Sequence, residues 1–175
     1  MGSCSTRNYT DIIKEKELIH LNKIPWSPLD SFLKIVDVYQ EKDYLRLTIH
    51  SLHISNSCPK CHHTSSHRRS RYTRLVQDLP LMDQPVKLLL ISNKWFCDSI
   101  NCSVKVFSER YKWLAPNGRC TLRAEEVLRK ITFSTSCLAG EKVAQAMHLP
   151  VSHDILLTII YKTTIDIEVS PFCRD

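Results

Sequence analysis

The chain has 175 residues, and its 43% of hydrophobic and 24% of charged side chains are typical of one folded domain or two small ones. It contains only three glycines, which excludes the glycine-rich loops that bind nucleotide cofactors. No apolar run reaches the roughly 20 residues of a membrane-spanning helix, and the N-terminus lacks the pattern of a secretory signal. We therefore expect a cytoplasmic protein with no membrane contact and no nucleotide cofactor.

Basic side chains are concentrated in the middle of the chain. The net charge is +6, and residues 60–130 hold fourteen lysines and arginines against six acidic residues, while the flanking segments are close to neutral. Such a local excess is typical of proteins that bind a polyanion, and it favours double-stranded DNA as the partner. A run of solvated surface charge would give the same count.

β-Branched and aromatic residues predict short strands after an N-terminal segment of residues 1–30. The predicted strands are residues 33–39, 44–49, 72–77, 86–96 and 104–107. Polar residues join the first two strands into a hairpin, and prolines within 78–80 and 83–85 indicate a break between the next two. We expect residues 31–115 to form a small antiparallel sheet, too thin to bury a sufficient core without a metal ion.

Four of the eight cysteines form two closely spaced pairs. Two residues separate Cys58 from Cys61, and four residues separate Cys97 from Cys102. Each pair lies on a predicted turn, and two such turns supply the four thiolates that a tetrahedral zinc ion requires. We expect a structural zinc ion with no open coordination position, whose binding contributes roughly 10–16 kcal/mol in small zinc peptides.

Other interpretations of the cysteines remain open. A C-x-x-C pair can be a dithiol redox centre, although such a centre lies where a strand feeds a helix, and strands flank both pairs here. Three nearby histidines could replace one thiolate as a ligand: His62, His63 and His67. The lone Cys120 and Cys137 are expected to be small buried hydrophobic residues.

After residue 118 the hydrophobic period changes from two residues to 3.6, which predicts three helices. Thr121 caps the first, a second begins near Gly140, and a third begins at Ser152. The expected buried positions are Ala124, Val127, Leu128 and Ile131 in the first helix, Val143, Ala144 and Met147 in the second, and Ile155, Leu156, Ile159 and Ile160 in the third. Residues 116–163 fit a helix-turn-helix, or equally a three-helix packing unit without a ligand. Residues 164–175 form a tail, in which residues 165–169 alternate like a short strand.

Several further motifs follow one another in a characteristic order. They are Arg71-Tyr72-x-Arg74 before Asp78-Leu79-Pro80, Phe107-Ser108-Glu109-Arg110 after the second cysteine pair, and Arg119-x-Thr121 at the start of a helix. With the two cysteine turns, this order over about residues 30–162 resembles the N-terminal half of the ISL-three type insertion-sequence transposases. The resemblance implies an α+β protein, a zinc ribbon followed by a helix-turn-helix unit that holds the terminal inverted repeats of the element.

The catalytic half of these transposases lies downstream and uses three carboxylates to bind two divalent metal ions. Only residues 163–175 follow the third predicted helix here, and converging carboxylates need a folded sheet to hold them. We therefore expect a truncated DNA-binding portion that is not an enzyme.

The candidate DNA-binding residues lie in the ribbon and in the helices. By the resemblance, the third helix should reach a DNA groove through Ser152, His153, Thr158 and Lys162, yet it carries a single lysine. Phosphate binding then falls on basic residues elsewhere, which can hold DNA without reading its sequence. These residues are Arg68, Arg69, Arg71, Arg74, Arg119, Arg123, Arg129 and Lys130.

A second class of function stays open, in which the zinc ribbon pairs with another protein and the basic charge serves solubility. The partners to consider are then a second copy of the chain or a full-length transposase. Residues 1–6 also fit the pattern for N-myristoylation, which is short and common.

Overall fold

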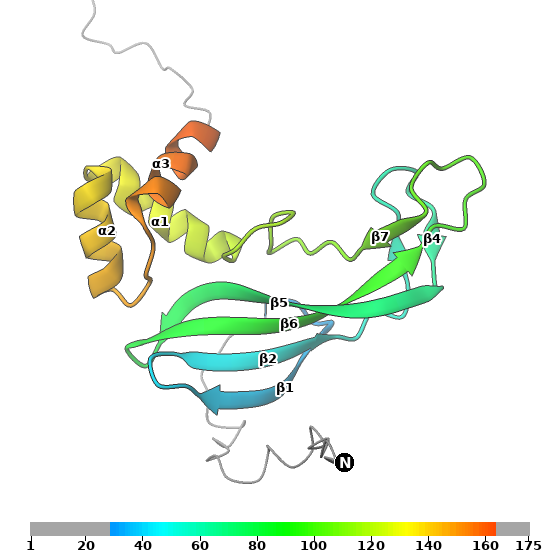
Figure 1. The fold of residues 1–175 in the computed structure, drawn as a ribbon, viewed down its shortest axis with the longest axis horizontal. Helices are drawn as coiled ribbons and strands as arrows, with labels where there is room; N and C mark the ends of the chain where they lie inside the picture. Colours follow the sequence, from blue (N-terminus) through cyan, green and yellow to red (C-terminus); the bar gives the residue numbers. More distant parts are fainter. Residues whose placement is uncertain (1–28, 164–175) are drawn as a thin grey trace, which may run out of the picture.

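The computed structural model describes residues 29–163, in which a mixed sheet and a two-stranded ribbon precede three helices (Figure 1). The strands are β1 (Leu33–Gln40), β2 (Leu45–Ser51), β3 (Asn56–Ser57), β4 (Thr64–Ser65), β5 (Arg68–Leu81), β6 (Gln84–Phe96) and β7 (Val106–Ser108). The helices are α1 (Leu122–Ser134), α2 (Cys137–Ala146) and α3 (His153–Lys162). The predicted strand at 165–169 and the myristoylation pattern lie outside the described residues.

The main sheet has the strand order β1-β2-β6-β5, and β7 pairs with β6 beyond the end of β2. The hairpin β1–β2 is confirmed, and β5 and β6 are also antiparallel neighbours. The expectation of a purely antiparallel sheet is wrong, because β2 and β6 are parallel. After β2 the chain passes through the first cysteine turn before it forms β5, so the returning β6 inserts between β2 and β5.

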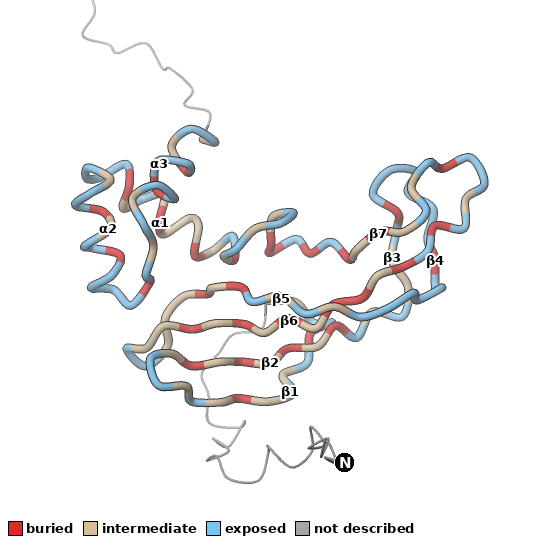
Figure 2. The backbone as a smooth tube through the Cα atoms, in the orientation of Figure 1, coloured by how far each residue is buried: buried red, intermediate tan, exposed pale blue. Residues whose placement is uncertain are grey.

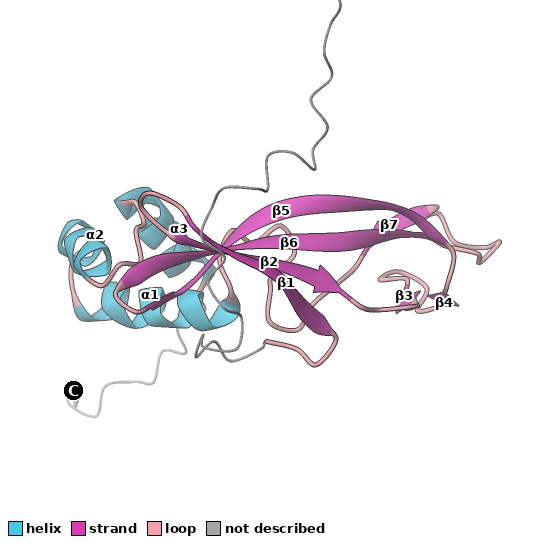
Figure 3. Ribbon diagram, turned by 90° about the horizontal axis from the view of Figure 1, so that it is seen from below, coloured by secondary structure: helices cyan, strands magenta, loops and turns pink. Residues whose placement is uncertain are grey.

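The β5–β6 hairpin is longer than predicted and joins the two ends of the molecule, with the cysteine turns at one end and the helices at the other (Figure 3). The break between these strands lies within the predicted range of 78–85 but is shorter than expected, since only Met82 and Asp83 form the turn. Pro80 fits within β5 because this strand lies at the edge of the sheet and its register shifts between Asp78 and Leu81.

The sheet has a hydrophobic core of its own, and its dependence on the metal ion stays a prediction. Side chains of β2 and β6 such as Leu47, Ile49 and Leu88 are fully buried. Figure 2 shows buried positions recurring along both strands. The segment 109–121, which returns from β7 to α1 (Figure 1), adds Tyr111 and Trp113 to this core. The core is separate from the cluster that contains the cysteines.

The three helices pack on one another around a second core that includes Ala124, Leu128 and Leu156. Thr121 caps α1 as predicted, since its hydroxyl oxygen accepts a hydrogen bond from the Ala124 backbone N–H at 3.3 Å. Cys120 and Cys137 are half-buried and pack against this core. Among residues 29–163, no helix has the length and hydrophobicity of a membrane span.

The helix boundaries and faces differ from the prediction in detail. α2 begins at Cys137 rather than near Gly140, because Ser136 caps it. Gly140 is buried inside α2, where an added Cβ would stand 3.2 Å from Leu156 Cδ1, so its small size permits α2 and α3 to approach closely. Residues 147–152 link these two helices in a longer connection than a tight turn. Three residues expected to be buried are exposed instead: Val143, Met147 and Ile155.

Candidate zinc site and basic surface

The first cysteine turn is closed by backbone hydrogen bonds between β3 and β4. The Cys58 N–H donates to the His63 carbonyl oxygen and the His62 N–H donates to the Cys58 carbonyl oxygen, each at 2.9 Å. His62 has a φ of 58°, a left-handed conformation that lets the chain reverse within this short turn. The turn therefore points the side chains of Cys58 and Cys61 toward the second pair.

The second cysteine turn follows directly from β6. The Cys97 N–H donates to the Lys105 carbonyl oxygen at 2.9 Å, and the Cys102 N–H donates to the Ser99 carbonyl oxygen at 3.2 Å. β7 then returns along β6, which holds the two ends of this turn together.

The two turns bring the four sulfur atoms together, with all of them within 4.8 Å of one another. The Cys58 and Cys102 sulfurs are 3.9 Å apart, and the Cys61 and Cys97 sulfurs are 3.5 Å apart. Tetrahedral zinc with bonds of about 2.3 Å separates its sulfur ligands by about 3.8 Å. The residues thus fit one structural zinc ion, as predicted, and four converging thiols do not favour a dithiol redox centre.

The sulfur atoms differ in how readily they lose a proton. Hydrogen bonds from the backbone of Cys61 and Lys60 outweigh burial and lower the pKa of Cys58 to about 7. At Cys97 the Ser99 backbone stabilises the thiolate, but burial and the neighbouring thiols outweigh it and raise the pKa to about 12. A zinc ion supplies the positive charge that four adjacent thiolates need, so its binding releases protons from this group.

Histidines do not join the metal-ligating group, which in the described part of the chain consists of the four cysteines. His67 instead places its Nδ1 3.0 Å from a carboxylate oxygen of Asp98. Ser65 donates a second hydrogen bond to Asp98 at 2.9 Å, and these contacts from Ser65 and His67 lower the pKa of Asp98. The contacts tie the segment after the first cysteine turn to the second turn.

Glu109 belongs to the motif after the second cysteine pair, but its role could not be predicted from the sequence. Its carboxylate is buried beside β6 at the seam where β2 ends and β7 begins. It accepts hydrogen bonds from the Asn93 backbone N–H at 3.1 Å, the Asn93 side chain at 2.8 Å and Trp95 Nε1 at 3.2 Å. Ser92 and Tyr111 donate two more. Between the ends of β2 and β7, neither strand pairs with β6, and Glu109 accepts hydrogen bonds from β6 there instead. Its hydrogen bond with Trp95 also links it to the buried cluster that contains the cysteines.

The β5 arginines predicted to bind DNA do not share one face of the sheet. Arg71 and Arg74 are three residues apart within one unbroken register, so their side chains lie on opposite faces. Burial lowers the pKa of His50, and the charges of Arg71 and Arg68 lower it further. Arg69 lies where the register shifts, with its guanidinium 5.8 Å from the centre of the Phe96 ring.

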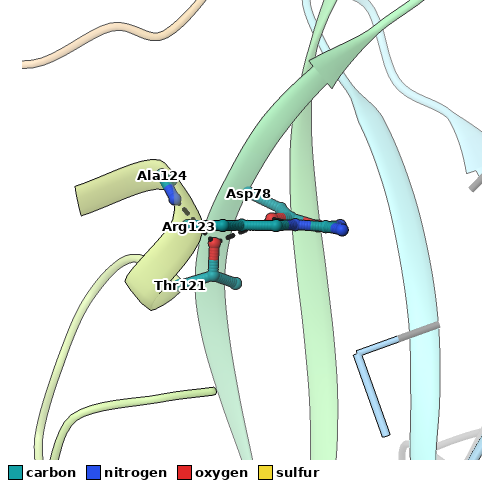
Figure 4. A network of polar contacts seen from close by, with 4 residues as sticks. All are labelled: Asp78, Thr121, Arg123 and Ala124. Carbon is teal, nitrogen blue, oxygen red and sulfur yellow. Dashed lines mark hydrogen bonds and ion pairs between the residues drawn. The ribbon is translucent and has the colours of Figure 1, made fainter. Parts of the chain in front are cut away.

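Arg123 is directed into the protein rather than toward solvent. Its Nε donates to the fully buried Asp78 carboxylate at 2.8 Å, and a second nitrogen contacts the other carboxylate oxygen (Figure 4). The Thr121 hydroxyl donates to Asp78 at 2.7 Å while it caps α1 at Ala124. The Asp-Leu-Pro and Arg-x-Thr motifs thus meet in space and fasten α1 to β5.

The other candidates on the helices also have local partners. Arg129 and Lys130 both pair with Glu126 on the surface of α1. His153 stands 3.2 Å from carboxylate oxygens of Glu141 and Asp154. Of the remaining candidates on α3, Thr158 donates to the Asp154 carbonyl oxygen at 2.8 Å, Ser152 makes no side-chain cap, and Lys162 is exposed. A role for these residues in DNA binding stays a prediction.

Comparison with known proteins supports the zinc ribbon. Residues 55–102 match a family model described as the zinc-finger of transposase IS204/IS1001/IS1096/IS1165. This range includes all four cysteines of the site, so the zinc-ribbon part of the resemblance and the structural zinc ion are confirmed. No curated protein and no solved structure matches the chain.

Proposed function

We propose that this protein binds double-stranded DNA in a transposase-related role, with its zinc ribbon holding a basic strand in place. The match of residues 55–102 to a transposase zinc finger supports this role. The observation that carries the proposal is the row of exposed arginines at the start of β5, immediately after the first cysteine turn: Arg68, Arg69 and Arg71.

These arginines are suited to phosphate contacts because no carboxylate neutralises them. None of the three forms an ion pair within residues 29–163. The basic residues of α1 that were predicted to contact DNA are all paired with acidic residues. Contacts to phosphate give affinity without sequence information. The zinc ion supplies no chemistry in this role, since four cysteines leave it no open position.

The helical unit is proposed to assist binding rather than to dominate it. The outward side of α3 carries Ile155, Leu157 and Tyr161, which are exposed, and its one lysine is Lys162. Such a surface offers few groups that could contact phosphates or base edges. We therefore do not assign the main DNA contacts to α3. In this role the described residues bind DNA without catalysis. A full-length transposase or a second copy of the chain is a further proposed partner.

The test measures binding of the full chain to a duplex oligonucleotide of mixed sequence by fluorescence anisotropy over a series of salt concentrations. We expect affinity to fall steeply with salt, and the triple variant Arg68→Gln, Arg69→Gln, Arg71→Gln to reduce the slope by about 0.9 for each phosphate contact removed. The control variant changes three exposed lysines instead: Lys34→Gln, Lys42→Gln and Lys142→Gln.

Equal weakening by both variants would show that only the net charge matters. Binding that does not change between low and moderate salt would contradict the proposal. Failure to bind DNA together with a stable complex with another protein would favour the protein-interaction role.

A further inference from the structure

A groove of about 690 Å³ lies between one face of the β5–β6 hairpin and the segment 109–121. Tyr72, Arg74 and Lys94 line it from the sheet, and Arg110 and Arg119 line it from the segment. It is on the face opposite Arg71, because Tyr72 and Arg74 alternate with Arg71 and Thr73 along β5. The groove is therefore distinct from the arginine row at the start of β5.

Backbone pairing at both ends of the segment sets the shape of this groove. At one end the Glu109 N–H donates to the Asn93 carbonyl oxygen at 3.1 Å. At the other end the Gln77 N–H donates to the Arg119 carbonyl oxygen at 2.8 Å, and the Arg74 guanidinium contacts the Gly118 carbonyl oxygen. The groove is thus formed before any ligand arrives.

Positive charge around the groove is not neutralised by the protein. Arg74, Lys94, Arg110 and Arg119 form no ion pair with a carboxylate anywhere in the described residues. The one acidic residue in the lining is Glu109, whose carboxylate is occupied by its hydrogen bonds to the neighbouring strand. Four cations against this one buried carboxylate leave an excess of positive charge, which favours an anionic ligand with several charges.

The groove combines these cations with aromatic surface. The Tyr72 ring lines the groove, and the Lys94 amine stands 5.3 Å from the ring centre. Alternating cations and aromatic rings are typical of sites for single-stranded nucleic acid, where phosphates meet the cations and bases stack on the rings. The volume is that of a site which encloses a small molecule, so it admits a few unpaired nucleotides and excludes a base-paired duplex.

We propose that this groove binds an unpaired single-stranded segment that extends from the bound duplex. The inference rests on the proposed DNA-binding function and adds a second site for a different form of nucleic acid. Arg110 and Arg119 hold the phosphates, and Tyr72 stacks against a base. The protein then distinguishes a duplex with a free strand at its end from a blunt duplex.

The test compares the full chain bound to a blunt duplex and to the same duplex with a single-stranded thymidine extension, by fluorescence anisotropy at one salt concentration. We expect the extension to raise affinity roughly tenfold, the gain from one or two stacked bases. The double variant Arg110→Gln, Arg119→Gln and the single variant Tyr72→Leu should each bring the ratio of the affinities for the extended and the blunt duplex close to one.

The matched control is Lys112→Gln combined with Lys142→Gln, which removes the same charge. Lys112 is exposed on the same segment as Arg110 but does not line the groove. Equal affinity of the wild-type chain for both duplexes, or a gain that survives in the Arg110 and Arg119 variant, would overturn the inference and leave the proposed function standing. Binding to neither duplex would instead overturn the proposed function, and tighter binding of a polyglutamate peptide than of the extension would assign the groove to an acidic protein.

Discussion

The Glu109 carboxylate keeps its charge although the residue is only 4% exposed. Burial alone would raise its pKa, but the hydrogen bonds from Tyr111 and Asn93 outweigh burial, so the pKa of Glu109 is lowered. A carboxyl group with a lowered pKa in the folded state contributes stability above its unfolded pKa and loses that contribution as the pH falls through the folded value.

We predict that Glu109→Gln lowers the free energy of unfolding at pH 7 by about 1–3 kcal/mol, because the amide repels some of the donors that the carboxylate satisfies. The difference from wild type should narrow as the pH falls below about 4. Urea denaturation over a pH series measures both effects. Asp43→Asn, at an exposed position in the β1–β2 turn, is the control. A difference that is unchanged at low pH would contradict this account.

The role of Glu109 could not be predicted from the sequence, although its spacing after Phe107 could be recognised. Its partners lie on β6 and become neighbours only because β7 pairs with that strand. The cysteine ligands were predictable, because each pair is adjacent in sequence and zinc chemistry requires the two pairs to meet.

At the scale of single elements, the β5–β6 turn departs from the preferred sequence for its geometry. Met82 and Asp83 have φ values of 51° and 57° in a two-residue loop, a conformation typical of a type I′ turn, which prefers Asn-Gly. The prolines predict a turn within residues 78–85, but its exact position could not be predicted because no Asn-Gly or Asp-Gly marks it. Pro80 lies within β5 rather than in the turn, which is possible because β5 is the edge strand of the sheet.

We predict that the double change Met82→Asn, Asp83→Gly stabilises the protein by about 1 kcal/mol, since a left-handed conformation costs an ordinary residue roughly that much. Thermal denaturation followed by circular dichroism measures the change. The control places the same two residue types in the β1–β2 turn, as Lys42→Asn and Asp43→Gly, where neither position has a positive φ. A gain of equal size at both turns would show that the turn conformation is not the cause.

Metal removal should affect one end of the molecule more than the other. Because the sheet core is separate from the cysteine cluster, chelation should increase hydrogen exchange in residues 56–65 and 97–107 and leave most protection in β2 and the first half of β6. Cys58→Ser should reproduce the effect of chelation, and Cys120→Ser, which removes a cysteine outside the site, should not. Global unfolding on chelation would contradict the prediction and support the expectation of a sheet that depends on its metal.

At the scale of the whole molecule, the helices are attached to the far end of the β5–β6 hairpin through few polar contacts. Arg123 and Thr121 converge on Asp78, and the Gln77 side-chain amide donates to the Pro150 carbonyl oxygen at 3.1 Å. The helices themselves were predictable from their period, but this attachment was not. The sequence predicts the same role, phosphate binding, for Arg123 and Arg129. Only the fold shows that Arg123 pairs with a buried carboxylate.

We predict that Arg123→Met destabilises the attachment of the helices by about 3–5 kcal/mol, because Asp78 then stays buried without its charged partner. Hydrogen exchange should accelerate in α1, α2 and α3 before it accelerates in the sheet. Arg129→Met is the matched control on the same helix, and loss of its exposed pair with Glu126 should cost less than about 1 kcal/mol. Similar effects of the two changes would refute the structural role of Arg123.

The unbroken register of Ser70 to Asp78 against β6 limits how the length of this strand can change. Insertion of one residue would exchange the two sides of the strand, so that Tyr72 and Arg74 would leave the groove and Val76 would turn out of the core. Insertion of two residues would keep each side chain on its original face of the sheet and would only move it along the strand. Homologous sequences should therefore differ in the length of this strand by even numbers of residues, while the loops that precede it vary freely.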